Sequence, residues 1–349
     1  MHTNASCLLA VLPLVFVARL DAQERPHRVD QFLTSAVHLD AGQLASLSRG
    51  DVVAKVLPTS LDRDVTVFAA IHVNGSSADF VGRQRDLDRA LQSPTRTAGA
   101  VFGTPATEAD VREIAITNDD VSELRKCKPN DCNFKLPAAD MERLRTTIDW
   151  SSPDASALVA DYVRQRMIEY VSAYREHGDS AMVVYGDNGN VSASDALLAM
   201  LSDSAFAPSG TAALLRHLTD YPRDSLRGAT DAMFWSVDNL PHVRPILRIT
   251  HETIYAPPEL PGATIVAQKQ IYADHYFEAA LELLASIDDS TTVSADPRSG
   301  GFTLIAIRRY RFDHLPRGGL FNLRGRVIGG LRDALRADLL RLRREAEST

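Results

Sequence analysis

The strongest constraint on the fold is a run of alternating residues near the end of the chain. Between Phe277 and Asp288 every second residue is apolar, although the composition of the segment favours a helix. An alternation of period two places these side chains on one face of a half-buried strand, so we predict a strand over 277–288. The apolar positions are Phe277, Ala279, Leu281, Leu283, Ala285 and Ile287.

Strands flank this segment, and a long amphipathic helix follows it. We predict further strands over 245–255, 264–276 and 301–313, with a polar hairpin loop over 289–300. The helix predicted over 324–345 has one apolar stripe, formed by Val327, Ile328, Leu331, Leu335, Leu339 and Leu342. We expect this helix to lie across the sheet and to form one wall of any cavity.

The first part of the chain has a different pattern. Two strands over 50–57 and 65–73 and a helix over 77–91 precede a mainly helical stretch at about 105–226. Residues 23–40 are polar, and we expect them to form a mobile lead-in. The sequence therefore predicts an α+β fold, in which an antiparallel sheet grips a long C-terminal helix and carries a large helical insertion.

The N-terminus has the pattern of a secretory signal peptide. The segment from Cys7 to Ala18 is apolar but too short to span a bilayer, and Ala22 ends an LDA sequence that suits signal cleavage. We therefore predict a signal peptide over 1–22, a mature chain that begins at Gln23, and an exported protein that is periplasmic or secreted.

Two cysteines remain after the predicted cleavage, in the sequence CKPNDC. A turn over 129–131 can bring Cys127 and Cys132 together, and an oxidising compartment favours a disulfide bond between them. A redox-active pair is a weaker alternative, because the spacing is not CxxC. Zinc is disfavoured, because no second Cys or His pair lies at finger spacing. We expect neither a metal nor a cofactor.

The order of elements resembles the START-like or polyketide-cyclase-like superfamily, which has the helix-grip arrangement. The segments GDVVAKVL and VTVFAAIHV, with the late strands and the last helix, carry this resemblance. It implies a single START-like domain over 23–349 that encloses an apolar ligand. Four longer motifs resemble an uncharacterised family of secreted bacterial proteins and imply no activity: LRKCKPNDCNFKLP, FWSVDNLPHVRPILRITHETIY, KQIYADHYF and RRYRFD.

Polar and titratable side chains gather on the predicted late strands. The candidate ligand-binding residues are His251, Tyr255, Tyr272, Asp274, His275, Arg309 and Asp313. Alternate residues of a strand share a face, so a polar line of this kind inside a cavity could orient a ligand. His251 or His275 with Asp274 could instead form an acid–base pair. The third interpretation is that all seven are solvent-facing residues and cross-strand ion pairs.

The charge of the chain indicates which partners to expect. A net charge of −7 argues against non-specific binding of nucleic acid. The segment from Arg298 to Thr349 nevertheless has twelve arginines and five acidic residues. Arg332, Arg336 and Arg343 flank the apolar stripe of the last helix, so they could contact an anionic membrane. Alternatively, the basic end pairs with the acidic remainder of the protein.

These observations lead to one functional expectation and two alternatives. We expect an exported protein that binds or carries a small apolar or lipidic ligand in a cavity between sheet and helix. The first alternative is a hydrolase- or cyclase-type enzyme that uses the His/Asp pair, although the sequence contains no nucleophile elbow, phosphate loop, dinucleotide-binding loop or metalloprotease motif. The second is a protein-interaction module that uses the helical insertion.

Overall fold

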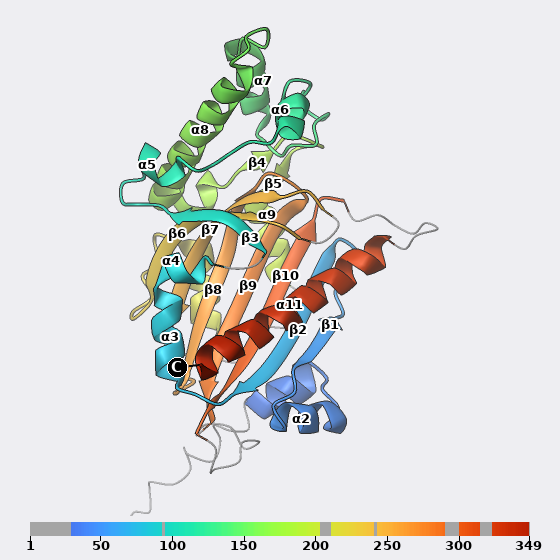
Figure 1. Ribbon diagram of the computed structural model, residues 1–349, viewed down its shortest axis with the longest axis vertical. Coiled ribbons are helices and arrows are strands. Elements are labelled where there is room, and N and C mark those ends of the chain that lie inside the picture. Colours follow the sequence, from blue (N-terminus) through green and yellow to red (C-terminus); the bar gives the residue numbers. More distant parts are fainter. Residues whose placement is uncertain are drawn as a thin grey trace, which may run out of the picture.

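The protein is α+β, with a large antiparallel sheet and a long C-terminal helix (Figure 1). The computed structural model describes residues 29–92, 95–202, 211–240, 243–289, 300–314 and 323–348. The predicted signal peptide over 1–22 lies outside the described residues, so export stays a prediction. No described helix is both long enough and apolar enough to cross a membrane.

Eight strands form the main sheet in the order β1-β2-β10-β9-β8-β7-β6-β3, and every neighbouring pair is antiparallel. The strands are β1 (Val53–Leu57), β2 (Asp64–Val73), β3 (Arg96–Val101), β6 (Thr230–Asp238), β7 (Ile246–Tyr255), β8 (Ala263–Ala273), β9 (Phe277–Asp288) and β10 (Phe302–Phe312). The strand predicted over 277–288 is confirmed as β9, so its period was a better guide than its composition. The sequence did not predict β3 and β6, which extend one edge of the sheet.

The helix α11 (Leu323–Glu347) lies across one face of the sheet (Figure 1). Leu331, Leu335 and Leu339 are buried in a cluster with apolar residues of β2 and β10. The predicted apolar stripe is thus confirmed as the side of the helix that packs on the sheet. The helix α11 therefore covers one face of the sheet.

Helices of the insertion cover the opposite face of the sheet. The long helix α8 (Ala155–His177) contributes Val163, Met167 and Val171 to a cluster with Trp235 of β6 and Ile249 of β7. Further along, α9 (Ala193–Leu201) and α10 (Ala212–Asp220) pack against β8 and β9. The other elements of the insertion are α5 (Glu108–Val111), α6 (Asn118–Leu124), α7 (Ala138–Thr147), η2 (Gly178–Ala181), β4 (Val184–Tyr185) and β5 (Val191–Ser192).

The segment before β1 packs against the sheet, so the predicted mobile lead-in over 23–40 is wrong for its described part. It contains η1 (Phe32–Ala36), and it is followed by α2 (Ala41–Ser48). The side chains of Val29, Leu33 and Val37 are buried in a cluster with residues of β1 and β2. Their spacing of four residues is typical of one helix face, and the polar residues between them concealed it.

After β2 the chain forms two short helices, α3 (Ser77–Arg85) and α4 (Leu87–Ala90), where the sequence predicted one helix over 77–91. Asp86 divides them, because its side chain accepts a hydrogen bond from the backbone N–H of Arg89 and so caps α4. These helices lie beside α11 at the edge of the sheet (Figure 1).

The structure joins Cys127 and Cys132 in a disulfide bond, with their Cα atoms 4.7 Å apart. We expect peptide mapping of the denatured, unreduced protein after thiol labelling to show neither cysteine labelled, and to show both labelled after reduction. Such a short loop stabilises by only about 2 kcal/mol, so the labelling pattern is a better test than stability. Labelling of both cysteines before reduction would refute the bond.

Candidate functional site

A cavity of about 130 Å³ lies between α11 and the sheet. Its walls come from α3, α4 and α11 and from strands between β3 and β10. One side of the cavity is apolar and includes Phe80, Ile246, Phe277, Leu335 and Leu339. A volume of this order accommodates one benzene-sized molecule in other protein cores.

Charged side chains of three strands form the other side of the cavity. Arg308 on β10 lies opposite Glu282 on β9, and its Nε is 2.8 Å from Glu282 Oε2. Arg248 on β7 donates from Nη1 to Glu282 Oε1 at 3.0 Å. The carboxylate of Glu282 is therefore held between two guanidinium groups.

Two more carboxylates complete this buried ion network. Arg248 also pairs with Asp238 of β6, and Arg308 Nη2 donates to Asp338 of α11 at 2.7 Å. Burial alone raises the pKa of Glu282, but the two arginines lower it to about 2. Glu282 is therefore ionised at neutral pH, and the network connects α11 to the sheet beside the cavity.

The lining of the cavity carries an excess of positive charge. Among the described residues, six arginines and four carboxylates line it, which gives a formal charge of +2. They are Arg83, Arg89, Arg96, Arg248, Arg308 and Arg341, with Asp238, Glu282, Asp338 and Glu345. The three arginines on the strands are matched by Asp238, Glu282 and Asp338, and Arg341 on α11 donates from Nη1 to Glu345 at 2.8 Å. The formal excess therefore lies on α3 and α4.

None of the seven sequence-predicted site residues lines this cavity. His251, Tyr255 and Tyr272 pack with the insertion on the opposite face of the sheet, and Arg309 donates from Nη2 to the carbonyl of Met200 in α9. We expected these side chains in the cavity beside the last helix, whereas these four lie on the opposite face of the sheet. A role of these residues in ligand binding stays a prediction.

His251 contacts Asp231 of β6, where the sequence suggested Asp274. Its Nε2 lies 3.0 Å from Asp231 Oδ1, and its Nδ1 lies 3.0 Å from the hydroxyl of Tyr174. Asp231 also lies 3.1 Å from Nε2 of His217 in α10. Sequence reasoning missed Asp231 and His217, because β6 was not predicted and α10 was assigned to the insertion.

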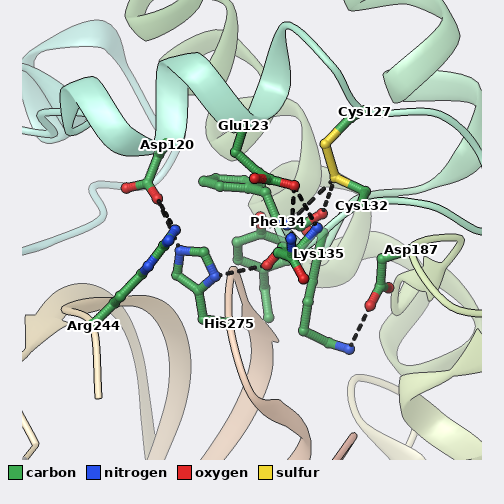
Figure 2. The surroundings of a disulfide bond; sticks show 11 residues. Asp120, Glu123, Cys127, Cys132, Phe134, Lys135, Asp187, Arg244 and His275 are labelled. Atoms are coloured by element: carbon green, nitrogen blue, oxygen red, sulfur yellow. Dashed lines mark hydrogen bonds and ion pairs between the residues drawn. A yellow bond between two sulfur atoms is a disulfide. The ribbon is translucent and has the colours of Figure 1, made fainter. Parts of the chain in front are cut away.

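His275 attaches the insertion to the sheet (Figure 2). His275 Nδ1 donates to the carbonyl of Asn133 at 2.9 Å, and its Nε2 lies 3.2 Å from Asp120 Oδ1. Burial opposes the charge of His275, but Asp120 and Asp274 raise its pKa. Asp274 itself accepts from the backbone N–H of Leu247 at 3.0 Å, so the expected His275–Asp274 hydrogen bond is replaced by the contact with Asp120.

Comparison with protein families and with curated proteins identifies no relative of the chain. The chain matches no protein-family model and no curated protein. The resemblances described from the sequence therefore stay predictions.

Lys135 of the insertion makes a second attachment, beside the disulfide (Figure 2). Its Nζ lies 3.2 Å from Asp187 and 3.3 Å from Asp313, and its ammonium also lies 4.5 Å from the ring centre of Tyr185. The hydroxyl of Tyr272 donates to the carbonyl of Lys135 at 3.0 Å. Tyr272 and Asp313, both candidate ligand-binding residues, therefore hold the insertion in place.

Two sets of described side chains have the residue types and spacing to hold a metal ion. One is Glu123 with Cys127 and Cys132, but the sulfur atoms of this set are joined to each other. The other is His217, Asp231 and His251, on the insertion side of the sheet.

The three arginines expected to meet a membrane have different surroundings. Arg332 pairs with Asp333, and Arg336 is exposed. Arg343 donates from Nη1 to the carbonyl of Gly50 at 2.6 Å, so part of its guanidinium is engaged within the protein. Contact of these residues with an anionic membrane stays a prediction.

Proposed function

We propose that the protein binds a small amphiphilic anion, such as a short carboxylic acid, in the cavity between α11 and the sheet. The observation that carries the proposal is the lining of this cavity, which is apolar on one side and rich in arginine on the other. A carboxylate forms strong charge-assisted hydrogen bonds with guanidinium groups, and a short chain or single ring fits a volume of this size. The proposal retains the expected carrier role and narrows the ligand from an apolar or lipidic molecule to an amphiphilic anion.

The charge distribution gives the ligand an orientation. The arginines of the sheet and Arg341 of α11 are balanced by carboxylates, whereas the surplus lies on α3 and α4. The anionic group should therefore point toward Arg89 of α4, and the apolar part toward Phe277 and Leu335. We also infer that the sheet and α11 form a helix-grip fold and that the protein acts after export.

The test compares two probes of equal length, hexanoate and 1-hexanol, by titration calorimetry. We expect hexanoate to bind at least about tenfold more tightly, because a charge-assisted hydrogen bond contributes about 1.5–3 kcal/mol. Arg89→Gln should remove most of this difference. Arg85→Gln is the matched control, because Arg85 is exposed on the neighbouring helix α3 and does not line the cavity.

Equal affinity of the two probes for the parent protein would contradict the proposal, and so would the absence of hexanoate binding at millimolar concentration. An equal loss in the Arg89→Gln and Arg85→Gln variants would also contradict it, because the effect would then come from the general charge of α3 and α4. Native mass spectrometry of protein purified from its own host would show a co-purified ligand directly.

A further inference from the structure

Two histidines and one aspartate converge on the insertion side of the sheet, on the face opposite the cavity. His217 comes from α10, Asp231 from β6 and His251 from β7. Both oxygens of Asp231 lie 3.1 Å from His217 Nε2, and Oδ1 lies 3.0 Å from His251 Nε2. The three candidate ligand atoms all lie within 4.8 Å of one another. In a tetrahedral zinc site with metal–nitrogen bonds of about 2.0–2.1 Å, neighbouring ligand atoms lie about 3.3 Å apart.

The outer nitrogen of each histidine already has a partner. His217 Nδ1 lies 2.7 Å from the carbonyl oxygen of Asp224, which can only accept a hydrogen bond. The proton of a neutral His217 is therefore on Nδ1, and the lone pair of Nε2 points at the carboxylate of Asp231. His251 Nδ1 has the hydroxyl of Tyr174 as its partner, at 3.0 Å. Metal-binding histidines are oriented in this way, with the other nitrogen fixed by a carbonyl or a polar side chain.

The surroundings of Asp231 favour a cation between these three groups. Its Oδ1 accepts a hydrogen bond from Thr253 Oγ1 at 2.6 Å and also faces both histidines. In the neutral His217 the Nε2 lone pair and the carboxylate lone pairs face each other at 3.1 Å, which is repulsive without a positive charge between them. A metal ion supplies that charge and uses all three groups at once.

The burial of the cluster leaves one side accessible. The side chains of His217 and His251 are 4% and 0% exposed, whereas that of Asp231 is 26% exposed. The ring of Tyr221 packs against His251, with ring centres 4.4 Å apart. Three protein ligands with an accessible side are typical of sites that keep a position for water or substrate, whereas structural zinc sites are closed by four ligands.

We propose that His217, Asp231 and His251 bind one divalent transition-metal ion of the zinc type. Two imidazoles and one carboxylate suit zinc, iron and cobalt, whereas magnesium and calcium prefer oxygen ligands throughout. The site is independent of the cavity under α11, since none of its three residues lines that cavity.

The test uses the full mature protein after treatment with a chelator. Equilibrium dialysis against Zn²⁺ should give one tightly bound ion per chain, and Co²⁺ at the same site should give visible absorption bands of a four- or five-coordinate ion. We expect Zn²⁺ to raise the melting temperature of the parent protein. His217→Gln and Asp231→Asn should each lower the affinity at least about a hundredfold, because each removes a direct ligand.

The matched control is His275→Gln. His275 is also buried and also contacts a carboxylate, Asp120, but it is in neither candidate metal-binding set of the described residues. This variant should keep the bound ion and its cobalt spectrum. Asp231→Asn serves as a second variant in case His217→Gln does not fold, because Asp231 is partly exposed and the change preserves its shape. Absence of stoichiometric binding by the folded parent, or unchanged binding in both site variants, would overturn the proposal.

Discussion

Leu335→Asp is expected to unfold the protein or to detach α11 from the sheet. Leu335 is 1% exposed and packs in the cluster that α11 shares with β2 and β10. The variant would bury a carboxylate without an ionic partner and remove the apolar contacts of leucine, which together cost several kcal/mol. Domains are stable by only about 5–15 kcal/mol, so a loss of this size is a large part of the total. Urea unfolding followed by circular dichroism measures it.

The control is the same substitution at an exposed leucine. Leu158 on α8 is 40% exposed, so Leu158→Asp should change the free energy of unfolding by less than about 1 kcal/mol. If both variants unfolded at the same urea concentration as the parent, α11 would not be part of the cooperative core.

Glu252→Gln is expected to stabilise the protein at alkaline pH and to have little effect in acid. Glu252 on β7 is 2% exposed, and Gln268 donates to its Oε2 at 2.7 Å. Burial raises the pKa of Glu252 from its ordinary 4.5 to about 7, and Gln268 only partly offsets this. The carboxyl group therefore favours the folded state fully below pH 4.5, and this advantage is lost as the pH rises toward 7. The glutamine does not titrate, so we expect the variant to gain up to about 3 kcal/mol over the parent by pH 8.

Glu282→Gln should have the opposite sign, although the residue is also a buried glutamate on the same face of the sheet. Arg308 and Arg248 outweigh burial and lower its pKa to about 2. Its ionised form stabilises the fold above pH 4.5, and this contribution is lost as the pH falls toward 2. We therefore expect a loss of about 3 kcal/mol at pH 7 that fades in acid. Unfolding free energies of both variants and the parent at pH 5 and pH 8 give the test, and shifts of the same sign in both variants would contradict it.

The elements that could be predicted from the sequence are those with a clear period. The alternation over 277–288 and the stripe through Leu331, Leu335 and Leu339 correctly predicted β9 and α11. The strand β3 was missed because its sequence, RTAGAV, is short and has small side chains with no clear alternation. These elements fix the sheet and its helix, but they do not say which face of the sheet each strand residue occupies.

The candidate site was harder to predict for that reason. Arg308 and Arg309 are adjacent on β10, yet Arg308 faces the cavity and Arg309 faces α9. A period of two divides the residues of a strand into two sets and does not say which set the last helix covers. The sequence did contain an indication of the ion network beside the cavity. Arg248, Glu282 and Arg308 carry charges of both signs, and they lie on one face of the sheet. His217 and Asp231 could not be joined to His251 from sequence, since their contact depends on how the insertion folds back.

The pairing of β2 with β10 sets a condition on how the chain folds. Arg311 of β10 donates from Nε to Asp64 of β2 at 2.7 Å, and the two residues are 247 positions apart in the sequence. β1 and β2 can join the rest of the sheet only after β10 has been synthesised, and α11 follows β10. The loop closed by this contact is long, and contacts of this range slow folding. We therefore expect the nascent chain to stay without its final sheet until β10 has been synthesised, a state in which β1 and β2 are open to other partners.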